Sequence, residues 1–339
     1  MTKSARNKTI DFTLEDAPAG VLEEITSDIQ ENPALRDLLN RTINGDSFKL
    51  MKKMPNQVID LALVDPPYNL DKKYDGMNFK SMSVTDYQTY TQSWIDYLKP
   101  LLKNNATVYV FSDWKTSIDI APILQKNFHV LNRITWEREK GRGALSNWKN
   151  SMEDIWFLTN SKEYNFNVDA VKLRRKVIAP YKEEGKAKDW EETKSGNFRD
   201  TMPSNFWSDI SVPYWSMPEN TGHPTQKPEK LLAKLILASS SEGDVIFDPF
   251  SGAGSSLVTA KKLNRNYIGI EQSLLYTAWG AYRLLQANTD KTIQGYTNGI
   301  FWERNTLGEQ KKAMTKASKA VKNRGDNSDD ITTSIDLFS

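Results

Sequence analysis

The sequence predicts an α/β protein with an open, mostly parallel sheet, and three observations support this fold class. Apolar strand-like runs alternate with helical segments from residue 41 to 136, and the same alternation returns from residue 222 to 304. Such alternation is typical of parallel sheets covered by helices. One apolar run ends in Asp-Pro-Pro-Tyr at 65–68, and another ends in a glycine turn at 248–254. Turns at strand ends are where such folds hold reactive groups and ligands.

Composition sets limits on the class of protein. The chain has 339 residues and a formal charge of +2, so any nucleic-acid face must be a local patch. It contains no cysteine, which excludes disulfides and thiolate zinc sites. His129 and His223 are the only histidines, so we expect no metal site. Without a signal peptide or long apolar run, we expect a cytoplasmic protein with no membrane partner.

The first half of the pattern begins with a βαβ unit. A short strand ends at Gly45-Asp46, a helix carries Phe48, and a second strand runs from Val58 to Val64. Further helices are expected at 87–102 and 118–127, with strands at 106–113 and 128–136. Residues 1–40 are expected to form an N-terminal helical extension.

The alternation of strands and helices weakens over residues 137–221, which hold loops, basic clusters and isolated aromatic residues. It resumes at Pro224. Pro228 suits the first turn of a helix that ends before Gly243. The expected elements that follow are a strand at 244–250, a helix at 254–264, a strand at 265–271 and a helix at 274–288. The charged tail at 305–339 is expected to be disordered.

The turn from Asp248 onward resembles the glycine turn of a nucleotide-binding βαβ unit. Gly252 and Gly254 allow close backbone approach to a ligand, and Glu271 ends the next strand, where a carboxylate typically bonds ribose hydroxyls. However, a third glycine is missing, and Asp248 would repel a pyrophosphate and attract a cation. S-adenosylmethionine fits this chemistry, because it carries an adenosine and a sulfonium but no phosphate. Alone, the turn is equally compatible with an ordinary βα connection.

Three motifs in chain order narrow the interpretation: Asp-Pro-Pro-Tyr, then "GHPTQKP" at 222–228, then "FSGAG" at 250–254. Together they resemble the β class of amino-group (adenine-N6 or cytosine-N4) DNA methyltransferases of restriction–modification systems, over about residues 40–290. The resemblance implies a Rossmann-like, S-adenosylmethionine-dependent methyltransferase fold. Its seven-stranded, mostly parallel sheet has one antiparallel strand and is circularly permuted. Residues 41–136 would be the catalytic half, 137–221 an inserted target-recognition region and 222–304 the cofactor-binding half.

The resemblance also assigns residues to roles. The catalytic turn would be Asp65, Pro66, Pro67 and Tyr68. The cofactor site would comprise Asp46, Asp65, Thr225, Lys227, Asp248, Phe250, Gly252, Gly254 and Glu271. Tyr68 and Trp136 would line the target-base pocket. Three of these residues have structural alternatives: Asp46 as a helix cap, Trp136 as a core side chain and Lys227 as a solvated lysine at a helix start.

The catalytic turn suits methylation of an exocyclic amine on a base flipped out of a duplex. The Asp65 carboxylate and the Pro66 carbonyl would accept hydrogen bonds from the amine and offset its growing positive charge. Tyr68 would stack on the base, which requires the ring face and not the hydroxyl. Asp at position 65 favours adenine-N6, since cytosine-N4 enzymes usually carry Ser there. The motifs also leave open an RNA or protein methyltransferase and a catalytically silent DNA-binding protein.

Basic clusters in the inserted region are candidate DNA contacts, although charge runs are usually solvated faces. The candidates are Arg138, Lys140, Arg142, Lys149, Lys172, Arg174, Arg175 and Lys176. Arg174 and Arg175 are expected to contact phosphates rather than bases, because dense cation runs suit the backbone. The resemblance implies double-stranded DNA as partner and a bacterial or phage-encoded origin. Relatives often form homodimers and often share their site with a cognate restriction endonuclease, but the sequence does not reveal which bases are recognised.

Overall fold

The computed structural model describes residues 6–75, 77–138, 145–177, 182–183, 186–187, 190–193, 196–306 and 308–310. The chain divides into two compact units. The first takes in Met1–Val171 and Pro203–Ile293, and the second takes in Lys172–Met202 and Gln294–Ser339. The region expected at 137–221 is therefore not one body, because its two ends belong to the first unit and only its middle belongs to the second.

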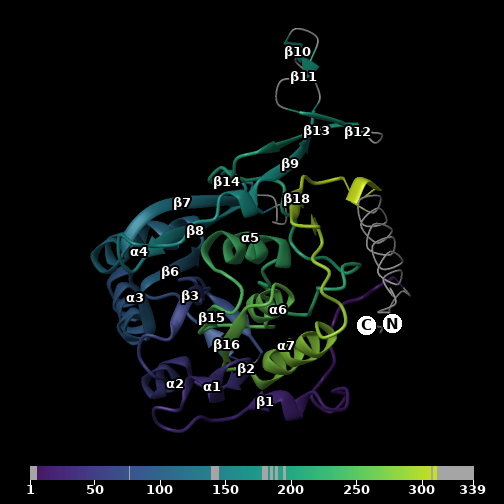
Figure 1. Ribbon diagram of the computed structural model, residues 1–339. Coiled ribbons are helices and arrows are strands. Elements are labelled where there is room, and N and C mark those ends of the chain that lie inside the picture. Colours follow the sequence, from purple (N-terminus) through teal and green to yellow (C-terminus); the bar gives the residue numbers. More distant parts are fainter. Residues whose placement is uncertain are drawn as a thin grey trace, which may run out of the picture. The chain divides into compact units, whose positions relative to one another are not determined.

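A nine-stranded sheet forms the centre of the first unit (Figure 1). Its spatial order is β1 (Ile25–Thr26), β2 (Arg41–Asn44), β16 (Asn266–Glu271), β15 (Val245–Asp248), β3 (Ile59–Val64), β6 (Leu102–Ser112), β8 (Met152–Thr159), β7 (His129–Glu137) and β14 (Phe206–Trp207). All neighbours are parallel except β8, which runs antiparallel to β6 and β7. The seven strands from β2 to β7 confirm the expected sheet, and two-residue strands extend both edges. The late strands β15 and β16 lie between the early strands β2 and β3, as circular permutation requires.

Two rows of helices cover the sheet. One row is α2 (Ser47–Lys53), α3 (Val84–Leu98) and α4 (Trp114–Asn127), and the other is α5 (Glu229–Ser239), α6 (Ser255–Lys262) and α7 (Leu274–Gln286). Strand β16 shows that they lie on opposite faces, because its side chains alternate. Ile268 and Ile270 join the same core cluster as Met51 of α2. A Cβ at Gly269 would come within 2.3 Å of Leu257 of α6.

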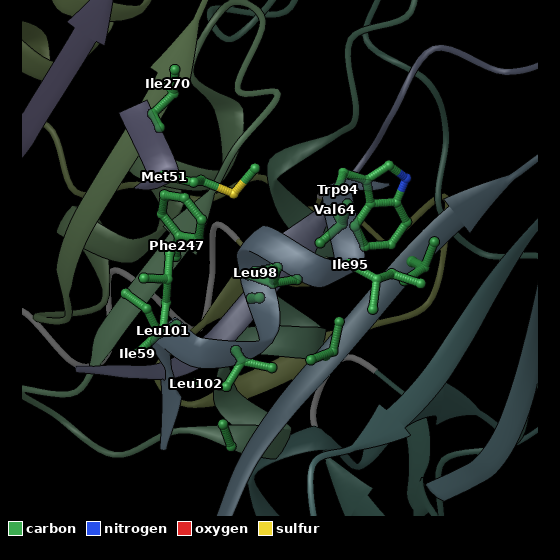
Figure 2. Close-up of a cluster of buried hydrophobic side chains, with 14 of the residues drawn as sticks. Met51, Ile59, Val64, Trp94, Ile95, Leu98, Leu101, Leu102, Phe247 and Ile270 are labelled. Carbon is green, nitrogen blue, oxygen red and sulfur yellow. The ribbon is translucent and has the colours of Figure 1, made fainter. Parts of the chain in front are cut away.

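The core on the α2–α4 face contains large side chains from helices and strands that are far apart in the sequence. Figure 2 shows Met51 of α2, Trp94 and Leu98 of α3, and Phe247 and Ile270 of the sheet in this cluster. All of these side chains are buried. Because central parallel strands are buried on both faces, they appear in the sequence as continuous apolar runs, which made β3 and β15 predictable.

Polar caps fix where several helices begin. Asp46, Ser83, Asp113 and Ser273 each accept a hydrogen bond from a backbone N–H in the first turn, at the starts of α2, α3, α4 and α7. Helix α6 begins differently, at Gly254 with φ +70°, where a Cβ would lie 3.0 Å from the Cα of Gly280. This close approach requires glycine on α6 and holds α7 against it.

The structure differs from expectation at the N-terminus and after residue 137. The described part of residues 1–40 is mostly irregular, with only η1 (Leu22–Glu24) and α1 (Leu35–Leu38) as helices. Instead of forming a helical extension, it adds β1 to the sheet, and Ile10 bridges to Thr221. Strand β8 lies within residues 137–221, where the sequence predicted loops. A short hairpin of β4 (Lys72–Tyr74) and β5 (Met77–Phe79), with η2 (Lys99–Leu101) and η3 (Asp169–Val171), completes the first unit.

The second unit contains a five-stranded sheet of β12 (Glu191–Thr193), β13 (Gly196–Thr201), β9 (Leu173–Lys176), β18 (Ile300–Trp302) and β17 (Tyr296–Thr297). A separate hairpin joins β10 (Lys182–Glu183) to β11 (Lys186–Ala187). Phe198 of β13 packs edge-on against Trp302 of β18, which ties the two parts of the chain that form this unit. Among the described helices of the whole chain, none is long and apolar enough to cross a membrane.

Candidate active site

The main cavity of the first unit has a volume of about 430 Å³ and lies at the carboxyl ends of four neighbouring strands. Asp46 lies just after β2, Glu271 ends β16, Phe250 lies just after β15, and Asp65 follows β3. Because these strands are parallel neighbours, their ends converge on one edge of the sheet. The cavity is also lined by Ser47, Phe48, Pro66, Pro67, Tyr68, Phe79, Tyr90, His223, Thr225, Pro249, Gly252, Gln272 and Tyr276. The fold thus brings the Asp-Pro-Pro-Tyr turn and the glycine turn into a single cavity.

The cavity wall is acidic. Asp46, Asp65 and Glu271 all line it, and the described lining residues include no lysine or arginine. His223 adds no charge, because burial, followed by the nearby cations Lys227, Lys72 and Arg283, lowers its pKa to about 3. This wall favours a cationic ligand and disfavours one that carries a pyrophosphate. The carboxylates of the cavity wall therefore fit S-adenosylmethionine better than a dinucleotide.

The glycine turn and Glu271 are joined by backbone hydrogen bonds. The N–H groups of Gly252 and Ser273 donate to the two carboxylate oxygens of Glu271, each at 2.8 Å. Burial nevertheless raises the pKa of Glu271, since it outweighs these donors. Gly252 has φ +52°, and a Cβ there would lie 3.0 Å from Nε2 of His223. Glycine at this position therefore lets the turn pass close to the cavity, as expected.

Two predicted cofactor residues shape the turn and helix beside the cavity. Asp46 accepts a hydrogen bond from the backbone N–H of Phe48 at 2.9 Å, so it caps α2 and also lines the cavity. Asp248 is buried behind the wall: it accepts from the N–H of Phe250 at 3.0 Å and from the hydroxyl of Ser256. The carboxylate oxygens of Asp248 fix the turn and do not line the main cavity, and its expected role in the cofactor site stays a prediction. Gly254 likewise acts in helix packing.

Hydrogen bonds from three side chains hold the Asp65–Tyr68 turn. Tyr87 of α3 donates its hydroxyl to the Pro67 carbonyl at 2.8 Å, which anchors the turn to the helix. Tyr68 is buried, and its hydroxyl lies 2.9 Å from Oδ1 of Asp65. Lys227 donates from Nζ to the second oxygen, Oδ2, at 2.6 Å. Both oxygens of Asp65 are therefore fixed in direction before any substrate arrives.

Lys227 is neither a solvated lysine nor a lining residue of the main cavity. Its side chain is 6% exposed, and Nζ lies between Asp65 and Glu153 at 2.6 and 3.5 Å. Burial alone would lower its pKa, but these two carboxylates outweigh burial and raise it. Lys227 therefore remains charged and is held on Asp65. It lines a smaller cavity together with Thr225 and Gly252, and its expected role at the cofactor stays a prediction.

Glu153 is a site residue that sequence reasoning missed. It lies on β8 with a side chain 5% exposed, and its Oε2 is 3.2 Å from the Tyr68 hydroxyl. Arg138, expected on DNA, turns inward and donates to Oε1 of Glu153. One sequence signal could have identified Glu153. In "MEDIWFLT", Glu153 and Asp154 stand beside an apolar run, and an acid in a buried strand must have a partner.

Trp136 is a core residue and does not line the main cavity. It is 1% exposed, and its indole N–H donates to the carbonyl of Ile210 at 2.8 Å. It pairs in register with Glu153 on β8 and with Trp207 on β14. Trp136 is therefore a core side chain. In this conformation it does not line the target-base pocket, contrary to what the resemblance had implied.

The remaining candidate DNA contacts are dispersed. Lys140 and Arg142 lie outside the described residues, while Lys149 lies in an exposed segment of the first unit. In the second unit, Arg174 forms a two-bond ion pair with Asp200 at 2.8 and 2.7 Å. Its guanidinium also lies 5.7 Å from the Trp302 ring centre. Within β9 and its flanks, Lys172 and Arg175 are partly exposed and Lys176 is exposed.

Comparison with known proteins shows the family of this chain. The Type II methyltransferase M.HpaI of Haemophilus parainfluenzae is 32% identical over 250 residues, covering 72% of this chain and 74% of that protein. The DNA adenine methyltransferase YhdJ of Escherichia coli (strain K12) is 31% identical over 244 residues, covering 71% and 81%. The solved PvuII DNA methyltransferase (cytosine-N4-specific) matches with a TM-score of 0.58 and 16% identity, covering 79% of this chain and 90% of that one, which supports the fold alone. A family model described as DNA methylase matches residues 59–279. This chain therefore belongs to the DNA methylase family.

Proposed function

We propose that this protein methylates the N6 amino group of adenine in duplex DNA, with S-adenosylmethionine as methyl donor. One observation carries the proposal: the Asp65–Tyr68 turn and the Glu271–Gly252 turn share one acidic cavity. The cavity holds a carboxylate for ribose hydroxyls at one strand end and hydrogen-bond acceptors for an amine at another. When bound, S-adenosylmethionine supplies an electrophilic methyl group on a sulfonium.

The residues of the catalytic turn activate the amine and do not attack anything themselves. The nitrogen lone pair of an exocyclic amine is delocalised into the ring, so it is a weak nucleophile. Acceptors fixed around the two amine hydrogens favour the more tetrahedral nitrogen and its growing positive charge. Lys227 and Tyr68 hold Asp65 for this task. Tyr87 bonds the Pro67 carbonyl and so anchors the turn that carries the other acceptor, the Pro66 carbonyl. The prolines restrict φ, which keeps the acceptors in place as the reaction proceeds.

The choice of adenine rests on Asp65 and on similarity to an adenine methyltransferase. YhdJ carries that activity in its name, and the chain covers 81% of its length. The duplex must release the target base into the cavity, where Tyr68 offers a ring face. We also propose, on the family resemblance, that Lys172, Arg175 and Lys176 of the second unit contribute to target recognition by contacting the DNA backbone.

One experiment tests the function and its main alternative. Purified protein is incubated with unmethylated duplex DNA and S-adenosylmethionine, and the DNA is digested to nucleosides for mass spectrometry. The expected product is deoxyadenosine heavier by one CH₂, and methylated deoxycytidine would instead show the cytosine-N4 activity. If neither nucleoside changes while the protein is folded and binds the cofactor, DNA methylation is refuted.

The proposal extends to partners in two respects. M.HpaI is named as a type II methyltransferase. We therefore propose a cognate restriction endonuclease that recognises the methylated site. On the family resemblance, we also propose a homodimer as the assembly. Methylated plasmid challenged with the endonuclease encoded beside the gene would test the first, and light scattering in solution would test the second.

A further inference from the structure

A buried network beside the catalytic turn joins five side chains through hydrogen bonds and ion pairs. Asp65 and Glu153 supply two negative charges, and Lys227 and Arg138 supply two positive charges. The Tyr68 hydroxyl lies between the two acids, 2.9 Å from Asp65 and 3.2 Å from Glu153. The charges of these five side chains balance, and Lys72 adds a further cation close to them. Amine activation by Asp65 does not require Glu153, so its placement needs a separate explanation.

The Tyr68 hydroxyl cannot satisfy both carboxylates at once. A phenol carries one hydrogen, so it can donate to only one of the two oxygens at any moment. The second contact is favourable only when that carboxyl group is protonated and donates to the phenol oxygen. A proton added to either acid is therefore accommodated by turning the hydroxyl toward the opposite acid. This geometry allows one proton to pass between Asp65 and Glu153.

The proposed reaction produces such a proton. A primary amine that gains a methyl group must lose one of its two hydrogens to become a neutral secondary amine. Asp65 accepts a hydrogen bond from this amine and is the first group that can take the proton. If the proton stayed on Asp65, Lys227, which is 6% exposed, would lose its nearest charged partner. A proton on Glu153 instead weakens mainly the pair with Arg138, whose side chain is 28% exposed and can be solvated.

We propose that Glu153 receives, through the Tyr68 hydroxyl, the proton that the target amine releases to Asp65; this inference rests on the proposed function. The N–H bond of the amine breaks and an O–H bond forms on Asp65. That proton then passes to the Tyr68 oxygen while the phenol hydrogen passes to Oε2 of Glu153. Asp65 is again a carboxylate paired with Lys227, Tyr68 is neutral before and after, and the proton resides on Glu153. The proton leaves Glu153 to solvent water in a later step. Arg138, which pairs with Oε1 and is 28% exposed, stays charged and does not carry the proton.

Glu153 is in this scheme a positioning residue, since it acts through Tyr68 and does not touch the base. The Tyr68 ring face would stack on the base as expected from sequence, but the hydroxyl now has a role of its own. Tyr68→Phe should therefore impair turnover, whereas a stacking role alone would leave it active. This difference separates the two accounts of the same residue.

The test measures single-turnover methylation of duplex DNA by the full chain, with steady-state KM values. Glu153→Gln and Tyr68→Phe should each lower the single-turnover rate at least about tenfold, a modest share of what acid–base groups contribute. KM for S-adenosylmethionine and for DNA should stay within about twofold, because neither change alters ground-state binding. Since both residues act in series, the double variant should be no slower than the slower single variant.

Asp154→Asn is the matched control. It makes the same acid-to-amide change at the next position on β8, where side chains alternate, and its carboxylate bonds Thr135 at 3.2 Å instead of the network. We expect wild-type turnover from this control. Any of three results would overturn the relay. They are an equal loss of single-turnover rate in Asp154→Asn, a multiplicative loss of rate in the double variant, or a wild-type rate in Glu153→Gln. A wild-type protein that methylates no nucleoside would overturn the proposed function and the relay with it, whereas active wild type with unimpaired Glu153→Gln overturns the relay alone.

Discussion

Replacing Asp65 should separate methyl transfer from cofactor binding, provided that the substitution respects the charge beside it. Lys227 is 6% exposed and donates to Asp65 at 2.6 Å. Asp65→Ala would leave this cation without its nearest partner, and breaking a buried pair typically costs about 3–5 kcal/mol of stability. Because Glu153 still lies 3.5 Å from Nζ, we expect the lower end of that range. A loss of activity in Asp65→Ala would therefore combine chemistry with unfolding.

Asp65→Asn avoids this difficulty. The amide oxygen can still accept from Lys227, and the amide nitrogen can donate to the Tyr68 oxygen, which then donates to Glu153. The fold should survive, but the side chain now presents hydrogens to the amine instead of an acceptor. Loss of one such preorganised partner lowers turnover by about 10²–10³-fold. We expect a loss of this size in single-turnover methylation.

Two further measurements complete the assay on Asp65→Asn. Calorimetry should give an S-adenosylmethionine affinity within about threefold of wild type, because the cofactor turn is centred on Glu271 and Gly252. Thermal unfolding should show an intact fold. Turnover close to wild type would refute the role of Asp65 as acceptor. A folded variant that has lost cofactor binding would show that the turn had been misassigned.

Core packing, a buried acid and the second unit each give a further prediction. Trp136→Phe should lower the free energy of unfolding by about 2–3 kcal/mol, because the Ile210 carbonyl loses its donor and a cavity opens in the core. The value of kcat should not change. A loss of activity without a loss of stability would instead support the role of Trp136 in the target-base pocket. Burial raises the pKa of Asp248 from 3.8 to about 7, so the folded protein keeps this proton at pH values where the unfolded chain has lost it. Wild-type stability should therefore fall relative to Asp248→Asn as pH rises across that window, and parallel unfolding curves for the two proteins would contradict the shift. Lys176→Ala should make the slope of log K for DNA binding against log salt concentration shallower by about 0.9. Arg174→Ala should lower thermal stability and leave this slope unchanged, because the Arg174 guanidinium is paired with Asp200. The reverse pattern would support the expected phosphate contact of Arg174.

The sequence by itself determined the fold class and the two turns of the site. Strands β3 and β15 are continuous apolar runs buried on both faces, and each is followed directly by its functional turn. Such information is local to a few residues. Prolines restrict φ, glycines permit positive φ, and an acid directly after a strand lies at the edge of the sheet. The meeting of Asp65 and Glu271 in one cavity was implied by the family resemblance, and the parallel strands β3 and β16 explain it, because their carboxyl ends lie at the same edge of the sheet.

Only the tertiary structure decided which charges pair. Lys227 meets Asp65 across 162 positions of sequence, and Glu153 meets Tyr68 across 85. No local pattern encodes such a contact, because the energy of an ion pair depends on distance in space and on burial. Strand β8 was hidden for a related reason: two adjacent acids in a fully buried strand point to opposite faces, so they remove the periodicity that identifies a strand. The partners that neutralise those acids become neighbours only when the sheet forms.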